Sequence, residues 1–241
     1  METPLKFDLF IFGSTSELMQ ALIRDYQPWF LAHVNRLILT QRTETYPEVY
    51  KPFSPVSIQL DCANPQAFGA QLAEIATTYG THERPMCIFP TYGVFNWNYA
   101  TKNPVFAYHP DAWQINLNSR LQVIEAFRPF SNARFHLFGS LFANFPYTGD
   151  YALSMWYVNQ LPRNSEYQAL DLIIYNLGGM KTRFWNWESM PGNPFLYDQL
   201  PTKFLFETGF LHPENRGIYT HYPSVPARIA CTLGRMGVRV L

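Results

Sequence analysis

The sequence predicts an α/β fold with a doubly wound, mostly parallel sheet in a single domain. Short apolar runs alternate with helical patterns through the first two thirds of the 241-residue chain, and this alternation is typical of βαβ units. The chain shows no internal repeat and no flexible Gly/Ser linker, and its length suits one domain. With 47% hydrophobic and 15% charged residues, it can bury a sizeable core.

The expected strands are short runs of apolar or alternating residues. They lie at 7–12, 37–40, 56–60, 86–89, 134–138 and 170–175, and residues 238–241 could add a last strand. The expected helices show apolar residues on one face or a clear stop at proline. They run from about residue 16 until Pro28, and then over 65–79, 111–127 and 151–160, the last limited by Pro162.

The first strand ends at Gly13, where Ser14 or Thr15 can cap the following helix and Glu17 lies in its first turn. A strand, a glycine and a helix N-terminus in this order can hold a phosphate, because backbone N–H groups point at the anion. Glycine permits close approach, since it has no Cβ. The same pattern also fits a tight turn that needs glycine only for its dihedral angles.

The last third of the chain changes character. Residues 183–222 are rich in aromatic side chains and are interrupted by prolines. This segment is expected to form an aromatic-rich C-terminal flap. It can complete the core, or it can act as a substrate lid over the ends of the strands, where ligands bind in open α/β sheets. The two interpretations are compatible.

Composition excludes several classes of function. Lys and Arg total 18, as do Asp and Glu, so the positive excess of a nucleic-acid-binding protein is missing. No apolar stretch reaches the roughly 18 residues of a membrane helix, and no signal-peptide pattern opens the sequence. The cysteines at 62, 87 and 231 suggest neither a disulfide framework nor a zinc site, and the histidines lack metal-ligand spacing. We therefore expect a cytoplasmic protein without a metal.

Eight short motifs follow one another in a characteristic order. They are Gly13-Ser14-Thr15-Ser16-Glu17-Leu18, Leu39-Thr40-Gln41-Arg42, Asp61-Cys62, Pro90-Thr91-Tyr92-Gly93, the stretch from Asp111 to Leu117 around Asn116, Phe138-Gly139-Ser140, the stretch from Tyr151 to Met155, and the stretch from Asn176 to Thr182 that contains Gly178. Between about residues 6 and 182, the chain resembles the short-chain dehydrogenase/reductase family. The resemblance implies a Rossmann-like sheet with strand order 3-2-1-4-5-6 and room for a seventh strand.

The resemblance also implies roles for individual residues. Tyr151 would exchange a proton with the substrate oxygen, Ser140 would hydrogen-bond that oxygen, and Asn116 would support a proton-relay water. The residues that would bind the cofactor are Gly13, Ser14, Thr15, Ser16, Leu18, Arg42, Asp61, Cys62, Tyr92, Gly93, Gly178 and Thr182. In the family, an acidic residue near this position selects NAD. Arg42 stands there instead and favours NADP, since a guanidinium can pair with a 2′-phosphate. Arg42 can equally be an exposed surface residue.

Two residues depart from the family pattern. Met155 occupies the position of the family's active-site lysine, and it has neither a charge nor a strong donor. None of the five lysines is near it in the sequence, so Tyr151 is expected to keep a pKa near the reference value of about 10. Met19 stands where the family has the last glycine of the phosphate loop, and we expect it to separate the helix from the strand or reshape the loop.

Three functions follow from these residues. The first is NADP-dependent reduction of a carbonyl or a related small organic substrate. The second is a catalytically reduced family member that binds a ligand or a partner protein. The third is a non-redox enzyme using the same pocket. The family commonly pairs through the tyrosine-bearing helix, which Pro162 shortens here, so a homodimer or a monomer is expected rather than a tetramer.

Overall fold

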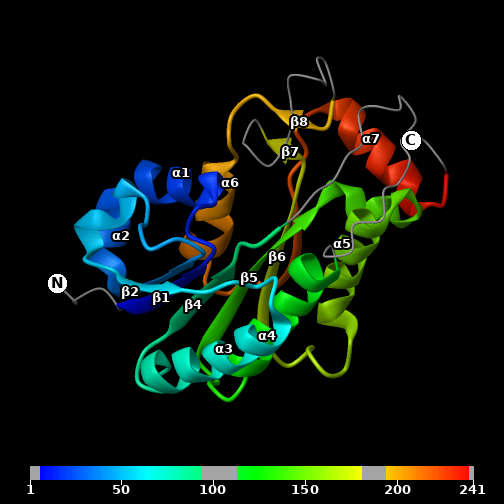
Figure 1. Cartoon of the computed structure of the whole chain (residues 1–241). Helices are drawn as coiled ribbons and strands as arrows, with labels where there is room; N and C mark the ends of the chain where they lie inside the picture. Colours follow the sequence, from blue (N-terminus) through cyan, green and yellow to red (C-terminus); the bar gives the residue numbers. More distant parts are fainter. Residues whose placement is uncertain (1–5, 94–112, 181–193, 239–241) are drawn as a thin grey trace.

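A seven-stranded parallel sheet forms the centre of this computed structural model (Figure 1). The structure describes residues 6–93, 113–180 and 194–238. The strands are β1 (Phe7–Phe12), β2 (Val34–Gln41), β3 (Val56–Gln59), β4 (Met86–Pro90), β5 (Ala133–Ser140), β6 (Asp171–Leu177) and β9 (Gly217–Thr220). Their order is β3-β2-β1-β4-β5-β6-β9, and all neighbours pair in parallel. The predicted doubly wound sheet and its strand order are thus confirmed.

The seventh strand does not come from the segment expected to supply it. The place beside β6 is taken by β9, which comes from within the aromatic-rich segment. Of the expected strand at 238–241, Val238 has no strand structure and residues 239–241 lie outside the described residues. A separate two-stranded pair joins β7 (Gly179–Met180) to β8 (Leu196–Tyr197).

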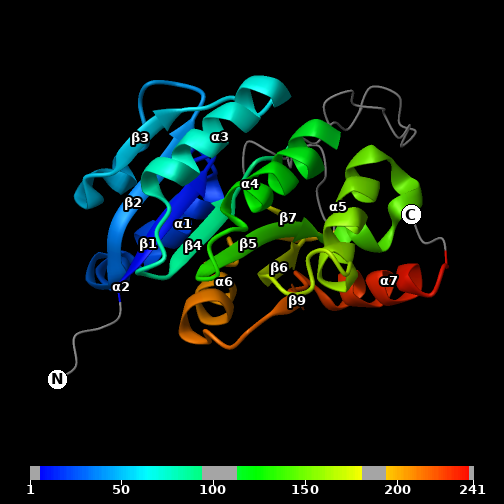
Figure 2. The same ribbon diagram turned by 90° about the horizontal axis from the view of Figure 1, so that it is seen from below.

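Helices cover both faces of the sheet (Figure 2). They are α1 (Glu17–Asp25), α2 (Gln27–His33) and α6 (Thr202–Phe206) on one face, α3 (Pro65–Tyr79), α4 (Ser119–Phe127) and α5 (Asp150–Gln160) on the other, and α7 (Val225–Arg235) beside the last strands. In β1, Phe10 and Phe12 join the core under α3 and α4, whereas Leu9 and Ile11 join the core under α1 and α2. This double burial is typical of parallel strands.

Most helix limits agree with the sequence, but the first helix differs. Ser16 is its N-cap, instead of Ser14 or Thr15, and its side chain accepts a hydrogen bond from the Met19 amide. The helix ends at Asp25, and Pro28 lies in the first turn of α2. Proline is tolerated in a first turn because the amide there has no intrahelical partner.

The described part of the aromatic-rich segment contributes to the core. Phe206 of α6 stacks on Tyr26 at 3.8 Å between ring centroids, and Phe210 lies edge-on to Phe30 at 5.0 Å. The segment thus covers α1 and α2 and supplies β9. Residues 183–193 lie outside the described residues, and a lid function for the segment stays a prediction.

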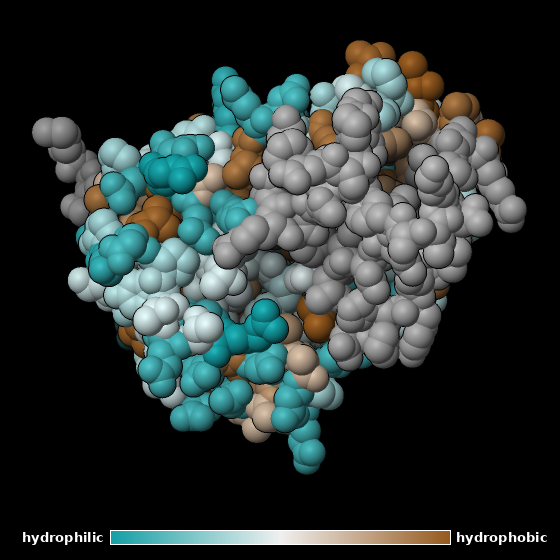
Figure 3. Space-filling model, turned by 45° about the horizontal axis from the view of Figure 1, so that its top comes forward, coloured by the Kyte–Doolittle hydropathy of each residue, from teal (hydrophilic) through white to brown (hydrophobic). Residues whose placement is uncertain are grey.

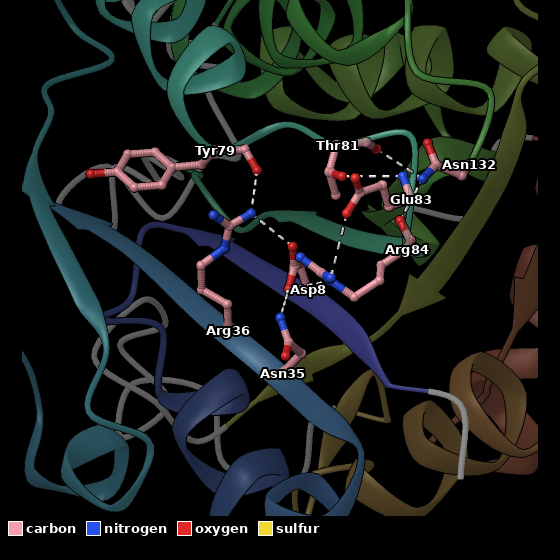
Figure 4. Close-up of polar contacts among 8 residues, drawn as sticks. All are labelled: Asp8, Asn35, Arg36, Tyr79, Thr81, Glu83, Arg84 and Asn132. Carbon is pink, nitrogen blue, oxygen red and sulfur yellow. Dashed lines mark hydrogen bonds and ion pairs between the residues drawn. The ribbon is translucent and has the colours of Figure 1, made fainter. Parts of the chain in front are cut away.

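The amino end of the sheet holds a buried carboxylate (Figure 4). Asp8 of β1 is fully buried, and its Oδ2 lies 2.7 Å from Nη2 of Arg36. Its Oδ1 accepts a hydrogen bond from Asn35 at 2.8 Å and lies 3.9 Å from Nε of Arg84. The carboxylate therefore has two cations and an amide donor, and it joins β1 to β2 and to the segment before β4.

The surface carries exposed apolar side chains along α7. Val225, Ile229 and Met236 are 70%, 56% and 65% exposed, and Figure 3 shows apolar groups gathered at the upper right, the side on which α7 lies in Figure 1. Within the described ranges, none of the helices combines the length and apolar character that a membrane crossing needs.

Candidate active site

Tyr151 begins its helix at the carboxyl edge of the sheet. It is the second residue of α5, which follows Gly149 at φ 130°. Only glycine adopts this backbone conformation readily. Gly149 is the N-cap of this helix, and Asp150 is its first residue. The turn at Gly149 brings Tyr151 back toward the end of β5.

The Tyr151 hydroxyl lies near Ser140, which lowers the pKa of the phenol. Ser140 is the last residue of β5, and its Oγ accepts a hydrogen bond from the Phe142 amide at 3.2 Å, which fixes its position. Tyr147, the other tyrosine between β5 and α5, lies in a short 3₁₀ turn, is 38% exposed and packs edge-on against Phe145. The proximity expected for Tyr151 and Ser140 is therefore present, while their catalytic roles stay predictions.

Asn116 is fully buried in an unusual turn. Residues Gln114–Asn118 form a π-helical turn directly before α4, and after it Ser119 donates to the carbonyl of Ile115 at 2.7 Å. Such turns occur frequently at functional sites. The described helix begins at Trp113, because residues 111 and 112 of the expected helix lie outside the described residues.

Arg120 is a buried cation that the sequence analysis did not identify. It is 3% exposed and lies on α4, four residues after Asn116. Its Nη1 donates to the carbonyl of Phe138 at 2.6 Å and lies 3.6 Å from Sδ of Met155. Its Nη2 donates to the carbonyl of Tyr92 at 2.8 Å. The lysines offer no cation near Met155 in the sequence, and the spacing of four residues between Asn116 and Arg120 was the available signal.

Burial and charge act against each other on Tyr151. Burial raises the pKa of its hydroxyl above the ordinary value, while the nearby Ser140 and the Arg120 charge lower that pKa. The expectation of an ordinary phenol pKa is therefore wrong, because it ignored burial. Burial lowers the pKa of Arg120 to about 10, so the guanidinium is still charged at pH 7. A positive charge thus acts on Tyr151 although Met155 has none.

The turn after β1 leads into α1, and several of its polar groups already have hydrogen-bond partners. Gly13 has φ 92°, and a Cβ there would lie 2.8 Å from Oγ1 of Thr91. The amides of Gly13 and Ser14 both donate to the Thr40 carbonyl, at 3.0 and 2.9 Å. The buried Ser14 hydroxyl donates to Oε1 of Gln41 at 2.7 Å. Ser14 therefore stabilises the turn with its side chain.

The remaining residues expected in the loop differ in exposure. Thr15 is exposed, Ser16 is the half-buried cap of α1, and Leu18 is buried. Met19 was expected to separate helix from strand or to reshape the loop. It is fully buried among the side chains of the core under α1.

Further expected cofactor residues line the same edge of the sheet. Arg42 after β2 and Asp61 after β3 are exposed. Cys62 is buried, which raises the pKa of its thiol to about 11. Tyr92 follows β4, and its hydroxyl lies 3.4 Å from Oγ1 of Thr40. The partly buried Gly93 comes next.

Gly178 is required at its position for packing, and Thr182 is not described. A Cβ at Gly178 would lie 2.3 Å from the Phe195 carbonyl oxygen. Thr182 lies outside the described residues. Within the described part of the chain, no group of His, Cys, Asp and Glu side chains could hold a metal ion.

The comparisons with known proteins support the fold. No family model and no curated protein sequence matches the chain. A protein from Burkholderia multivorans described as a short-chain dehydrogenase/reductase, with bound NADP, matches with TM-score 0.64 and 12% identity over 92% of this chain and 100% of its own. Serine dehydrogenase from Escherichia coli matches with TM-score 0.62 and 16% identity over 89% of this chain and 97% of its own. Alcohol dehydrogenase from Thermococcus sibiricus, complexed with 5-hydroxy-NADP, matches with TM-score 0.61 and 15% identity over 91% of this chain and 97% of its own. The chain has the fold of the short-chain dehydrogenases/reductases.

Proposed function

We propose that this protein is an NADP-dependent reductase of a carbonyl or a related small organic substrate. The observation that carries the proposal is that Tyr151 lies near Ser140 at the carboxyl edge of the sheet, where the charge of the buried Arg120 acts on it. Ligands bind at this edge in open α/β sheets. Two of the structural neighbours contain NADP or 5-hydroxy-NADP.

The residues at the start of α1 fit the phosphates of a dinucleotide. Gly13 lets Thr91 and Tyr92 approach the turn closely, and the space at the amino end of the nine-residue helix α1 favours an anion. Because Met19 is buried in the core, it does not take up this space. Arg42 is exposed beyond β2, where its guanidinium could pair with a 2′-phosphate. The Tyr92 ring would form the wall beside Gly13, since a Cβ on Gly13 would lie 3.3 Å from it.

The chemistry divides between cofactor and protein. NADPH, when bound, supplies a hydride to the carbonyl carbon. The Tyr151 hydroxyl, which is protonated at pH 7, donates its proton to the carbonyl oxygen. The Ser140 hydroxyl orients that oxygen. Asn116 supports the return of a proton to Tyr151.

The first test is cofactor binding. A ligand that binds only the folded state raises stability by RT ln(1 + [L]/Kd), so millimolar NADPH should raise the melting temperature. The rise should exceed that with NADH, and Arg42→Gln should reduce the difference. Unchanged melting in NADPH would contradict the proposal.

The second test is turnover with a panel of aldehydes and ketones, followed by NADPH absorbance. Binding of NADPH without turnover of any substrate would favour a ligand-binding protein, and conversion of a substrate without NADPH would favour a non-redox enzyme. If a substrate is reduced, turnover should depend on the Tyr151 hydroxyl.

A further inference from the structure

Arg120 is a buried cation in the candidate site. The roles proposed for Tyr151, Ser140 and Asn116 do not account for it. Its three acceptors come from three parts of the chain: the Phe138 carbonyl in β5, the Tyr92 carbonyl after β4 and the Met155 thioether in α5. These contacts hold the guanidinium in one place between α4 and α5. The Met155 sulfur lies against it, so the charge sits beside the position from which a lysine would act.

The charge of Arg120 is incompletely compensated. In the described ranges, no carboxylate lies within ion-pair distance of its guanidinium, and its buried Nε has no hydrogen-bond partner. Carbonyl and thioether acceptors satisfy N–H groups but carry no net negative charge. A buried cation in this state is stabilised by any negative charge that develops beside it. Tyr151 interacts electrostatically with Arg120 and can develop such a charge.

We propose that Arg120 is the positioning residue for Tyr151: its guanidinium stabilises the phenolate that forms when the hydroxyl gives its proton to substrate, in place of a lysine at position 155. This inference rests on the proposed reductase function. The step balances, because the proton leaves the Tyr151 oxygen for the substrate oxygen and the negative charge remains on the phenolate. Reprotonation of the phenolate through the Asn116 side completes the cycle.

The other groups near the pair do not supply this charge. Ser140 faces Tyr151 from β5 with a neutral hydroxyl. Cys62 acts on Arg120 from the end of β3, but burial and the neighbouring Asp61 raise the pKa of its thiol, so it is neutral at pH 7. Asp150 precedes Tyr151 in the chain and would repel a phenolate. Arg120 is therefore the cation, among the described residues, that acts on Tyr151.

The test measures the ionisation of residue 151 directly. A fluorotyrosine is incorporated at this position by genetic encoding and titrated by ¹⁹F NMR, because its phenol ionises at lower pH than tyrosine. Arg120→Gln should raise the titration midpoint by at least one pH unit. Adding Met155→Lys to Arg120→Gln should return the midpoint toward its original value, since the cation is restored from the adjacent position.

Matched controls separate the effect of charge from loss of structure. Arg36→Gln removes an arginine at the opposite end of the sheet and should leave the midpoint at residue 151 unchanged, even if melting falls. An unchanged midpoint in Arg120→Gln together with a lower melting temperature would overturn the inference and make Arg120 only a structural tether. A second measurement needs no arginine variant. Fluorotyrosine at 151 should ionise at lower pH than at Tyr50, whose pKa burial alone raises, and the reverse order would overturn the inference.

Turnover separates this inference from the proposed function. If NADPH reduces a substrate, kcat at pH 7 should fall at least tenfold in Arg120→Gln with a smaller change in KM, and the double variant should recover part of it. If the midpoint shifts as expected but no carbonyl substrate is reduced, Arg120 still controls Tyr151 and the reductase proposal fails. If turnover is observed and neither kcat nor the midpoint responds to Arg120→Gln, the inference fails and the reductase proposal remains.

Discussion

The two ends of the sheet bury charge in different ways. At the amino end, the Asp8 carboxylate is surrounded by Arg36, Arg84 and Asn35, so its charge is paired (Figure 4). At the carboxyl end, the Arg120 guanidinium is held by two carbonyls and a thioether, and the described residues give it no carboxylate. The first arrangement neutralises its charge, whereas the second leaves a field that acts on Tyr151.

The difference indicates which end serves structure and which serves chemistry. A paired buried carboxylate contributes to stability mainly because removing it would leave its partners uncompensated. A buried cation without a counter-charge costs stability, and such costs are typical of functional sites. Removing the Asp8 carboxylate should therefore change folding and leave binding intact, whereas removing the Tyr151 hydroxyl should change turnover and leave folding intact.

The largest expected effect is on turnover, from Tyr151→Phe. If the protein reduces a carbonyl substrate, loss of the hydroxyl should lower kcat/KM by about 10²–10⁴-fold, the usual contribution of a positioned general acid. The melting temperature and the NADPH shift should change little, because the ring stays and Ser140 keeps its bond to the Phe142 amide. Steady-state kinetics and thermal unfolding check this, with Tyr147→Phe as the control that should keep full turnover. Retained activity in Tyr151→Phe would contradict the assignment of the chemistry to the carboxyl end of the sheet.

The next largest effect is on stability, from Asp8→Asn. The change keeps the shape but leaves Arg36 and Arg84 without their carboxylate, and breaking a buried pair in this way costs about 3–5 kcal/mol. Urea unfolding should show the loss, and NADPH affinity of the folded variant should be unchanged. Glu48→Gln, which breaks the exposed pair with Lys51, is the control and should not move the unfolding midpoint. Equal effects of the two variants would show that burial of Asp8 does not matter.

The fold was predictable because its signals are local and repeated. Apolar runs such as Phe7–Phe12 and the helical spacing in 65–79 reproduce the observed elements closely. The last strand was expected at 238–241 and not at β9, because β9 is only four residues long and its hydrophobic pattern is weak. Short strands of this kind are defined by the neighbour they pair with, which the sequence does not display.

The candidate site was predictable only in part. Tyr151 and Ser140 could be found from motif order, and the structure places them near each other. The importance of Arg120 could not be found in this way, because its contacts reach Tyr92 and Phe138, 28 and 18 residues away in the chain. Met19 is buried under α1, and its expected effect on the loop stays a prediction. Electrostatic partners that the fold brings together can be identified only from the three-dimensional structure.

A third, smaller effect concerns how the free energy of unfolding depends on pH. It comes from a residue between the two ends of the sheet. His136 in β5 is fully buried, its Nδ1 lies 2.7 Å from the Tyr175 hydroxyl, and burial lowers its pKa well below the ordinary value. The unfolded chain, with a histidine pKa of about 6.5, then binds more protons than the folded protein below this pH. The free energy of unfolding should therefore fall as pH decreases below about 6.5, with a slope of up to ~1.4 kcal/mol per pH unit from this residue.

Urea unfolding of His136→Gln between pH 5 and 8 checks this expectation. The variant should be less stable at pH 8 but should lose less stability on acidification. His221→Gln removes a partly exposed histidine, whose pKa burial also lowers, and should reduce the slope less. A slope in His136→Gln equal to that of the unchanged protein would show that the histidine is not held neutral.

The smallest expected effect concerns Ser14 in the turn after β1, for which the sequence and the structure indicate different roles. Ser14 was expected among the cofactor-binding residues, but its hydroxyl donates to Gln41 at 2.7 Å in a buried position. Ser14→Ala leaves Oε1 of Gln41 without this donor, and loss of such a bond costs about 1 kcal/mol. Thermal unfolding should fall accordingly, while the rise produced by NADPH should be the same as in the unchanged protein. Thr15→Ala, at the exposed neighbour, gives the opposite expectation of unchanged stability and a smaller NADPH shift. If Ser14→Ala instead reduces the NADPH shift without loss of stability, its hydroxyl turns to the ligand when the cofactor binds.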